Sequence, residues 1–404
     1  MRKHILRCIS CKKEFEPKSG LYYCEDCGYI LGTLEVVYDY ESIKKETLVK
    51  EKKFDKKASM YQFEFLLPTK PKLKFDDDIG GTPLYKFDLL GMKDILIKYD
   101  GSNPSSSYKD RASSIAINRA LDEGNKIAFC ASTGNAASSL AMLNAHTEMD
   151  TYIFVPATIP DGKRAQLEIS GAKVFAIEGT YDEVYDFSLE LGLKKGWYCR
   201  HAAINPYLLE GKKTGAYEII IQNDFNIPDY VLVGVGDGTV VSSLYKGFLE
   251  FKEIGLTDKI PKIIGIQAEG ISAIKEAFDK GKPYKPISIE GKTIADSISV
   301  GKPRDVIKAC KYVEASNGFF ISLSDKEILD SIIELGKITG IFAEPAGAVP
   351  YGGLKKLIYE EKITNTDTVC LVITGNGLKD VNAVKGSINR ETLSFEEAMK
   401  RFEE

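Results

Sequence analysis

Long apolar runs and an excess of charge of one sign are both missing from this sequence. The chain of 404 residues carries 54 Lys and Arg against 58 Asp and Glu, which gives a net charge of −4. This near balance argues against a nucleic-acid-binding surface as the main function. No apolar run approaches the ~18 residues that a membrane-spanning helix needs, and the first residues lack the apolar stretch of a signal peptide. We therefore expect a cytoplasmic protein whose partners include neither a membrane nor a nucleic acid.

Internal repeats and low-complexity tracts are missing as well, and the composition is that of an ordinary globular protein, with 44% hydrophobic and 28% charged residues. The length predicts two or more domains of roughly 100–200 residues. From about residue 80, short apolar runs alternate with segments of helical period. This alternation predicts parallel sheets covered by helices on both faces.

The positions of these elements follow from the same pattern. The expected strands are 95–97, 126–130, 151–155, 173–177, 230–235, 262–267 and 368–373. The expected helices are 109–123, 135–146, 161–170, 181–195, 209–222, 240–254, 325–338 and 346–360. The remaining expectations are a short strand pair at 29–38, a helical or solvated connector at 41–60 and a surface loop at 279–292.

Half of the eight cysteines lie within the first 27 residues. They form two knuckles, Cys8-x-x-Cys11 and Cys24-x-x-Cys27, with twelve residues between them. Two such knuckles can place four thiolates around one tetrahedral Zn²⁺, and four protein ligands leave no position open for a substrate. The spacing predicts a structural zinc ribbon over residues 1–35, and a ribbon that folds without metal is the alternative. Without a secretory signal, a disulfide framework is not expected.

A small polar turn follows the strand expected to end at residue 130. It consists of Ser132, Thr133 and Gly134, and a helix is expected to begin at Asn135. Free backbone amides and the positive end of the helix dipole favour an anion at such a turn. Asn135 can donate a hydrogen bond to a phenolic oxygen. The alternative interpretation is a plain helix cap.

Three glycines gather in a second turn, again between an apolar strand and a helix. Gly234, Gly236 and Gly238 allow the backbone to wrap around a phosphate, with Asp237 among them and the hydroxyl of Thr239 following. Their spacing matches neither a nucleotide P-loop nor a dinucleotide fingerprint. The segment therefore predicts a cup for a single phosphate. A tight strand–helix turn is the alternative, and it explains one or two of these glycines more easily than all three.

A lysine and a threonine complete this set of residues. Lys109 follows a polar turn at a helix start, and a partly buried lysine near backbone amides can lose its proton and form a Schiff base. Thr374 follows the last strong strand, where its hydroxyl can hold a neutral ring nitrogen. Taken singly, each reads as a solvated helix start or another turn. Together with the two earlier turns they predict a phosphorylated aromatic aldehyde at the carboxyl ends of the strands, which describes pyridoxal phosphate.

With these residues in place, the chain resembles the fold-type II pyridoxal-phosphate enzymes, the tryptophan synthase β superfamily, and within it the threonine synthase family. The resemblance spans residues 80–380, in the segments 103–111, 132–138, 205–207, 210–214, 265–270, 295–301, 342–347 and 374–380. It implies an α/β fold of two parallel-sheet lobes behind the N-terminal ribbon. The expected parts are a large cofactor-binding lobe, 36–115 with 206–404, and a small mobile lobe, 116–205.

The resemblance also implies roles for individual residues. Lys109 resembles the catalytic Schiff-base lysine, Asn135 the partner of the ring oxygen, and Thr374 the partner of the pyridine nitrogen. The cofactor-binding residues it implies are Lys109, Asn135, Gly234, Gly236, Asp237, Gly238, Thr239 and Thr374. The substrate-binding residues it implies are Ser132, Thr133 and Gly134. A small amino acid is the expected substrate and a homodimer the expected assembly, whereas Glu344 and Lys213 receive no role.

The expected activity is elimination of phosphate from O-phosphohomoserine followed by addition of water. The sequence departs from the threonine synthase pattern at Ala202, Ala203 and Leu208, where relatives carry polar residues and an arginine that resemble contacts for the substrate phosphate. Each charge-assisted hydrogen bond lost there is worth roughly 1.5–3 kcal/mol. The alternatives are therefore a serine or threonine dehydratase-like lyase, or a β/γ-replacement synthase acting on another amino acid. A zinc-ribbon interaction protein without catalysis is a third alternative, which Lys109 disfavours.

Overall fold

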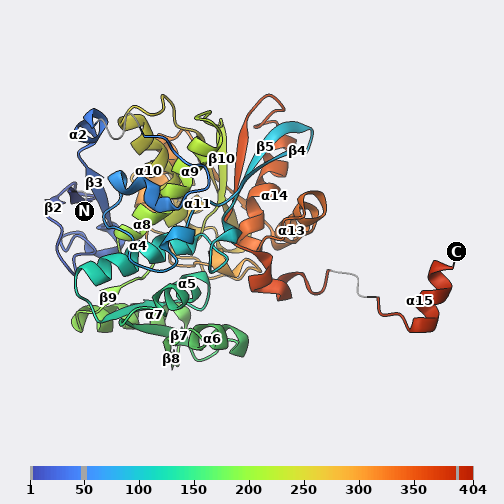
Figure 1. The fold of residues 1–404 in the computed structure, drawn as a ribbon, viewed down its shortest axis with the longest axis horizontal. Helices are drawn as coiled ribbons and strands as arrows, with labels where there is room; N and C mark the ends of the chain where they lie inside the picture. Colours follow the sequence, from blue (N-terminus) through green and yellow to red (C-terminus); the bar gives the residue numbers. More distant parts are fainter. Residues whose placement is uncertain (1–2, 47–51, 388–390, 404) are drawn as a thin grey trace.

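The computed structural model describes residues 3–46, 52–387 and 391–403, and within them three sheets organise the chain (Figure 1). The largest has the strand order β12-β11-β10-β13-β5-β4. Its strands are β4 Leu84–Leu89, β5 Met92–Tyr99, β10 Tyr230–Gly234, β11 Lys262–Ala268, β12 Phe319–Leu323 and β13 Val369–Ile373. All neighbours pair in parallel except the hairpin of β4 and β5. This mainly parallel sheet confirms the predicted α/β class.

Helices cover both faces of the large sheet. Along β5, Ile95 and Ile97 belong to one buried cluster while Leu96 between them belongs to another, and alternate residues of β10 divide in the same way. The described α-helices between residues 40 and 359, which include those beside the small sheet, are α2 Tyr40–Lys45, α4 Lys109–Asp122, α5 Asn135–Asn144, α6 Asp161–Glu168, α7 Tyr181–Lys194, α8 Tyr207–Lys212, α9 Thr214–Gln222, α10 Thr239–Glu253, α11 Ala273–Asp279, α12 Val306–Ala315, α13 Asp325–Thr339 and α14 Pro345–Tyr359. A sheet buried on both faces explains why its central strands are continuous apolar runs.

A second, smaller parallel sheet lies apart from the first, with the order β8-β7-β6-β9 (Figure 1). Its strands are β6 Ile127–Ala131, β7 Asp150–Pro156, β8 Lys173–Ile177 and β9 Tyr198–Cys199. Phe129 and Phe154 pack on one face with residues of α7, whereas Cys130 and Ile153 pack on the other with residues of α5. The division of the chain into lobes stays a prediction, but residues 127–199 do build a sheet of their own.

The N-terminal segment forms the third sheet, of β1 His4–Cys8, β2 Glu14–Phe15 and β3 Leu34–Tyr38 in the order β2-β1-β3. The expected strand pair at 29–38 is wrong, because the short helix α1 Gly28–Leu31 precedes a single strand. Gly28 takes a φ of +73°, which turns the chain back on itself after the second knuckle. Three body lysines donate to backbone carbonyls of this segment, Lys246 to Val36, Lys308 to Leu34 and Lys311 to Ile9. The sheet is thereby held against α10 and α12.

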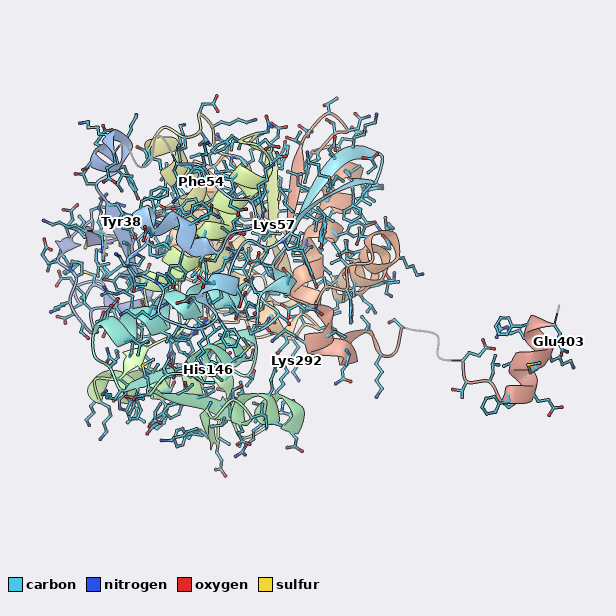
Figure 2. The ribbon with its side chains drawn as sticks, viewed as in Figure 1. Tyr38, Phe54, Lys57, His146, Lys292 and Glu403 are labelled. Carbon is cyan, nitrogen blue, oxygen red and sulfur yellow. The ribbon has the colours of Figure 1, made fainter. Side chains whose placement is uncertain are left out.

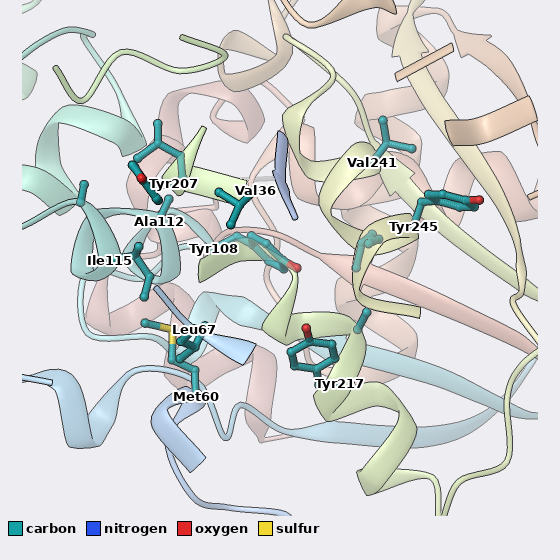
Figure 3. Close-up of a cluster of buried hydrophobic side chains, with 14 of the residues drawn as sticks. Val36, Met60, Leu67, Tyr108, Ala112, Ile115, Tyr207, Tyr217, Val241 and Tyr245 are labelled. Atoms are coloured by element: carbon teal, nitrogen blue, oxygen red, sulfur yellow. The ribbon is translucent and has the colours of Figure 1, made fainter. Parts of the chain in front are cut away.

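The core of the body joins the N-terminal sheet to the large sheet. Figure 3 shows part of it, with Val36 of β3, Tyr108 before α4 and Val241 of α10 in one buried cluster. Of the connector expected at 41–60, residues 47–51 lie outside the described residues, and the rest contains the end of α2 and the start of a 3-10 turn, Met60–Leu66. The expected loop at 279–292 is irregular from Lys280 onward.

The C-terminal helix α15, Phe395–Phe402, stands away from the rest of the molecule (Figures 1 and 2). In the part of the chain that the structure describes, no helix combines the length and the apolar character needed to cross a membrane.

Candidate active site

A cleft of about 880 Å³ opens where the carboxyl ends of both parallel sheets meet. Its walls are the loops that follow β6, β10 and β13, together with the start of α4. Parallel sheets gather ligands at this edge. Every residue that the sequence singled out for cofactor or substrate lines this one cleft, namely Lys109, Ser132, Thr133, Gly134, Asn135, Gly234, Gly236, Asp237, Gly238, Thr239 and Thr374.

Lys109 is the first residue of α4 and faces the cleft. Burial lowers the pKa of its amine below the ordinary value; Glu344 opposes this shift, and the nearby Arg200 adds to it. Within the described residues, its ammonium forms no hydrogen bond or ion pair. The result is an amine that loses its proton more readily than a surface lysine does, which is the condition for Schiff-base chemistry.

The two residues after Lys109, Asp110 and Arg111, hold the start of α4 in place through hydrogen bonds and ion pairs. Asp110 accepts hydrogen bonds from the backbone amide and the hydroxyl of Ser105. Arg111 is fully buried and pairs with two carboxylates: its Nε donates to Asp100 at 2.6 Å and its Nη1 to Glu218 at 2.5 Å. These contacts fix the first turn of α4 and with it the backbone of Lys109.

The Thr374 loop is hydrogen-bonded to the segment that precedes Lys109. The amide of Tyr108 donates to the carbonyl of Thr374 at 2.8 Å, and the amide of Asn376 donates to the carbonyl of Ser106 at 3.1 Å. Ser106 has a φ of +63°, in the left-handed region that favours glycine. These bonds set Thr374 and Lys109 side by side in the cleft.

A buried carboxylate, that of Glu344, accepts hydrogen bonds from Asn135, and no role for it was expected from the sequence. The Asn135 amide donates to both carboxylate oxygens of Glu344 at 2.9 Å and to the hydroxyl of Ser297 at 3.3 Å. Burial raises the pKa of Glu344, and Asn135 and Lys109 act against that shift. Asn135 begins α5 beside the small sheet, while Glu344 caps α14 beside the large one. The contact therefore crosses the cleft, between segments distant in sequence.

The glycines of the second turn are required by packing as well as by any ligand. A Cβ on Gly234 would lie 2.6 Å from the carbonyl oxygen of Ala346, and one on Gly238 would lie 2.8 Å from the Cβ of Ala309. Gly238 also has a φ of +91°. At Gly236 the closest approach is 3.1 Å, to the Cα of Ile298. The tight-turn interpretation thus explains more of this segment than its sequence suggested.

Two groups of opposite charge lie at the end of this turn, Asp237 from the turn itself and Lys212 from the end of α8. Asp237 lines the cleft, and burial raises the pKa of its carboxyl, whereas Arg304 lowers it. Lys212, which the sequence reasoning missed, donates to the hydroxyl of Thr239 at 2.6 Å. The residues beside Lys212, which lies between Gly211 and Lys213, give no signal of this contact.

Only one of the three positions that depart from the threonine synthase pattern faces the cleft. Ala202 lines it, whereas Ala203 and Leu208 are buried outside its lining. Arg200 is also fully buried, and its Nε and Nη2 donate to Ser113. His201 is a core residue: burial lowers its pKa to about 3, and its Nε2 lies 2.9 Å from the hydroxyl of Ser188.

The four N-terminal cysteines converge as their spacing predicts. The sulfur atoms of Cys8, Cys11, Cys24 and Cys27 all lie within 4.8 Å of one another, and those of Cys11 and Cys24 are 3.8 Å apart. Four sulfurs about 2.3 Å from a tetrahedral Zn²⁺ lie about 3.8 Å from each other. The distances between the four sulfur atoms therefore suit a metal site. None of the four cysteines lines the cleft.

Comparison with known proteins adds to this geometry. The model of the pyridoxal-phosphate dependent enzyme family matches residues 75–375. The chain is 38% identical over 389 residues to a threonine synthase of Methanocaldococcus jannaschii, covering 94% of each. It is 37% identical over 384 residues to a threonine synthase of Methanosarcina acetivorans, covering 94% of this chain and 93% of the relative.

Solved structures show the same fold at lower identity. A diaminopropionate ammonia lyase from Escherichia coli has a TM-score of 0.65 at 18% identity, covering 81% of this chain and 91% of that one. A processed threonine deaminase from Solanum lycopersicum has a TM-score of 0.62 at 22% identity, covering 80% and 87%. These likenesses concern the fold alone.

Proposed function

The chain belongs to the pyridoxal-phosphate dependent enzymes, within the threonine synthase family, and from this premise we propose that it is itself a threonine synthase. The reaction converts O-phosphohomoserine and water into threonine and phosphate. The observation that carries the proposal is one cleft that brings together Lys109, the glycine turn and Thr374 in a chain matching threonine synthases along 94% of its length.

The residues of the cleft fit the cofactor. Lys109 supplies the amine for the Schiff base, the amides and hydroxyl at 234–239 suit the phosphate, and Thr374 offers a hydroxyl to the ring nitrogen. Asn135 is assigned to the ring oxygen, and to reach it the amide must give up at least one of its hydrogen bonds to Glu344. When bound, pyridoxal phosphate supplies the electron sink for the reaction.

Lys109 is also the proton carrier of the proposed reaction. Its lowered pKa leaves more of the amine neutral near pH 7 than on an ordinary lysine, so Nζ can accept the proton from the substrate Cα. The same Nζ can then take a proton from Cβ as phosphate leaves Cγ, deliver a proton to Cγ, and return one to Cα after water adds its hydroxyl at Cβ. Thr133 and Gly134 lie on the same wall of the cleft and are assigned to the substrate carboxylate, with Ser132 beside them.

Two lysines provide positive charge for the substrate phosphate. Lys163 and Lys292 line the cleft, and Lys163 is paired with Asp296 at 2.6 Å. In this proposal they replace the arginine and polar residues that the threonine synthase pattern has at the positions of Ala202, Ala203 and Leu208. The small lobe, 116–205, is proposed to close over the large lobe and exclude water until the addition step.

A second candidate rests on Ala202, whose methyl group faces the cleft where relatives carry a polar side chain. A dehydratase-like lyase or a β/γ-replacement synthase would need no phosphate contact there. The test is to incubate the cofactor-loaded enzyme with phosphohomoserine, threonine, serine and related amino acids, and to identify the products. Threonine with one equivalent of phosphate supports the proposal, provided that Lys109→Ala abolishes both. A 2-oxo acid from threonine or serine, without phosphate release from phosphohomoserine, would support the second candidate.

We further propose that Cys8, Cys11, Cys24 and Cys27 hold a structural Zn²⁺. Their mutual distances suit tetrahedral thiolate coordination. A homodimer in the cytoplasm remains part of the proposal, and analytical ultracentrifugation of the purified enzyme tests the assembly.

A further inference from the structure

Lys212 is a buried lysine without a counter-charge. It ends α8, its side chain is 0% exposed, and its ammonium donates to the hydroxyl of Thr239 at 2.6 Å. In the described ranges this hydroxyl is its only hydrogen-bond partner, and no carboxylate forms an ion pair with it. Other fully buried lysines are paired: Lys98 with Glu218 at 2.6 Å, and Lys213 with Glu210 at 2.5 Å.

The charged surroundings of Lys212 make the missing partner costly. Burial lowers the pKa of its amine well below the ordinary value, and the nearby cations Lys109 and Arg200 lower it further. Asp237 and Asp305 act in the opposite direction without forming an ion pair. A buried ammonium is stable only when it is paired or hydrogen-bonded to an anion. An anion bound in the adjoining cleft would supply the negative charge that Lys212 lacks.

The hydrogen bond from Lys212 also fixes the direction of the Thr239 hydroxyl. In its charged form, which a bound anion favours, Lys212 has only donors, so the Thr239 oxygen accepts from it and the hydroxyl hydrogen is left for another acceptor. Among the described residues, no protein oxygen takes that hydrogen. Thr239 is the first residue of α10 and lines the cleft, directly after Gly238. The remaining donor is therefore available to a ligand in the cleft.

We propose that Lys212 is a positioning residue for the cofactor phosphate: its ammonium holds the Thr239 hydroxyl as a donor toward the phosphate and places a positive charge one hydrogen bond behind it. The proposal rests on the proposed function only in taking pyridoxal phosphate as the ligand of the cleft. It explains why a lysine is buried beside a turn that already offers backbone amides.

A double-mutant cycle on cofactor affinity tests this coupling. Lys212→Met, Thr239→Val and the double variant are titrated with pyridoxal phosphate and with pyridoxal, which lacks the phosphate. Each single substitution is expected to weaken pyridoxal phosphate binding by roughly 10- to 100-fold, the range for a hydrogen bond to a charged group. The double variant is expected to lose little more than the worse single one. Pyridoxal affinity is expected to change less than about twofold.

Two control variants and one spectroscopic measurement separate this role from a structural one. Thr239→Ser keeps the hydroxyl and should retain wild-type affinity, and Ser243→Ala removes a neighbouring hydroxyl that bonds within its own helix, to the carbonyl of Val240. Lys212→Met replaces a buried charge with an apolar side chain of similar length, a change that is often tolerated. In each variant that binds the cofactor, phosphorus NMR is expected to show a changed phosphate signal for Lys212→Met and an unchanged one for Ser243→Ala.

The outcomes are distinguishable from those that bear on the proposed function. If the wild type binds no pyridoxal phosphate, the proposed cofactor fails. If the wild type binds it but Lys212→Met binds equally well, or if pyridoxal affinity falls by the same factor, the positioning role is overturned. Additive effects of the two substitutions would overturn the coupling through Thr239.

Discussion

Replacing Arg111 with methionine tests how the fold fixes Lys109. The guanidinium of Arg111 holds Asp100 with Nε at 2.6 Å and Nη2 at 3.0 Å, and Glu218 with Nη1 at 2.5 Å and Nη2 at 2.8 Å. All of these side chains are fully buried. After the substitution Glu218 keeps Lys98 at 2.6 Å, whereas Asp100 keeps only neutral partners.

The expected cost follows from that single uncompensated carboxylate. Breaking a buried pair by removing one partner costs about 3–5 kcal/mol. We expect Arg111→Met to lower the free energy of unfolding by this amount, and Asp100→Asn added to it to restore about half, because the unpaired charge is then gone. Urea unfolding followed by circular dichroism measures both changes.

The pH dependence gives an independent check. Burial raises the pKa of Glu218, but Arg111 and Lys98 outweigh it and bring the pKa from its ordinary 4.5 to about 2. Because the folded pKa is depressed, the stability that Glu218 contributes is present above pH 4.5 and is lost as the pH falls toward 2. Removing Arg111 raises that folded pKa, so the cost should be largest at neutral pH and shrink in acid. A loss below about 1 kcal/mol at pH 7, or a loss that grows in acid, would refute the reasoning.

Three further predictions concern the metal and the cleft. The purified protein should contain one Zn²⁺ per chain, and Cys11→Ser, at the most exposed of the four thiols, should lower both the zinc content and the unfolding temperature; a full equivalent retained at unchanged stability contradicts the metal site. Asp237→Asn removes a negative charge beside the phosphate turn and should tighten pyridoxal phosphate binding roughly tenfold, measured by absorbance titration, whereas weaker binding would show that the carboxylate assists the ligand. Gly375→Ala places a Cβ 2.2 Å from a carboxylate oxygen of Glu344, so the carboxylate must move away. Asn135 then loses both hydrogen bonds to Glu344, including the one that can still position it when it turns to the ring oxygen, and kcat should fall roughly 10²-fold; an unchanged kcat would show that this contact does not position Asn135.

In the large sheet, most of the central strands were predictable from sequence and the edge strands were not. The strands β10, β11 and β13 lie within one or two residues of their expected positions because each is an apolar run between turns. The strands β6, β7 and β8 of the small sheet also lie within one residue of theirs, although β8 is an edge strand. The strands β4 and β12 were missed, and they are the two edges of the large sheet. The strand β4 carries polar and exposed residues and so lacks the apolar run that identifies a buried strand. The strand β12 is apolar and mostly buried, so this reason does not apply to it.

The residues of the cleft that lie in turns after strands were predictable from the local sequence. A turn after each parallel strand must lie at the carboxyl edge of its sheet, so Thr239 and Thr374, which follow neighbouring strands of the large sheet, were expected to lie close together. That Asn135 of the small sheet joins them depends on how the two sheets pack. Glu344 and Lys212 act through contacts to residues far along the chain, 209 and 27 positions away. Such contacts depend on how the helices pack, and nothing in the neighbouring residues specifies them.

Chemical trapping of the cofactor tests directly whether Lys109 is the lysine that forms the Schiff base. The enzyme loaded with pyridoxal phosphate is reduced with borohydride, digested, and its peptides are mapped by mass spectrometry. We expect the added phosphopyridoxyl group on Lys109, because this lysine lines the cleft and the pKa of its amine is lowered. A label on Lys212, the other lysine of lowered pKa beside the phosphate turn, or no label on either, would contradict this expectation.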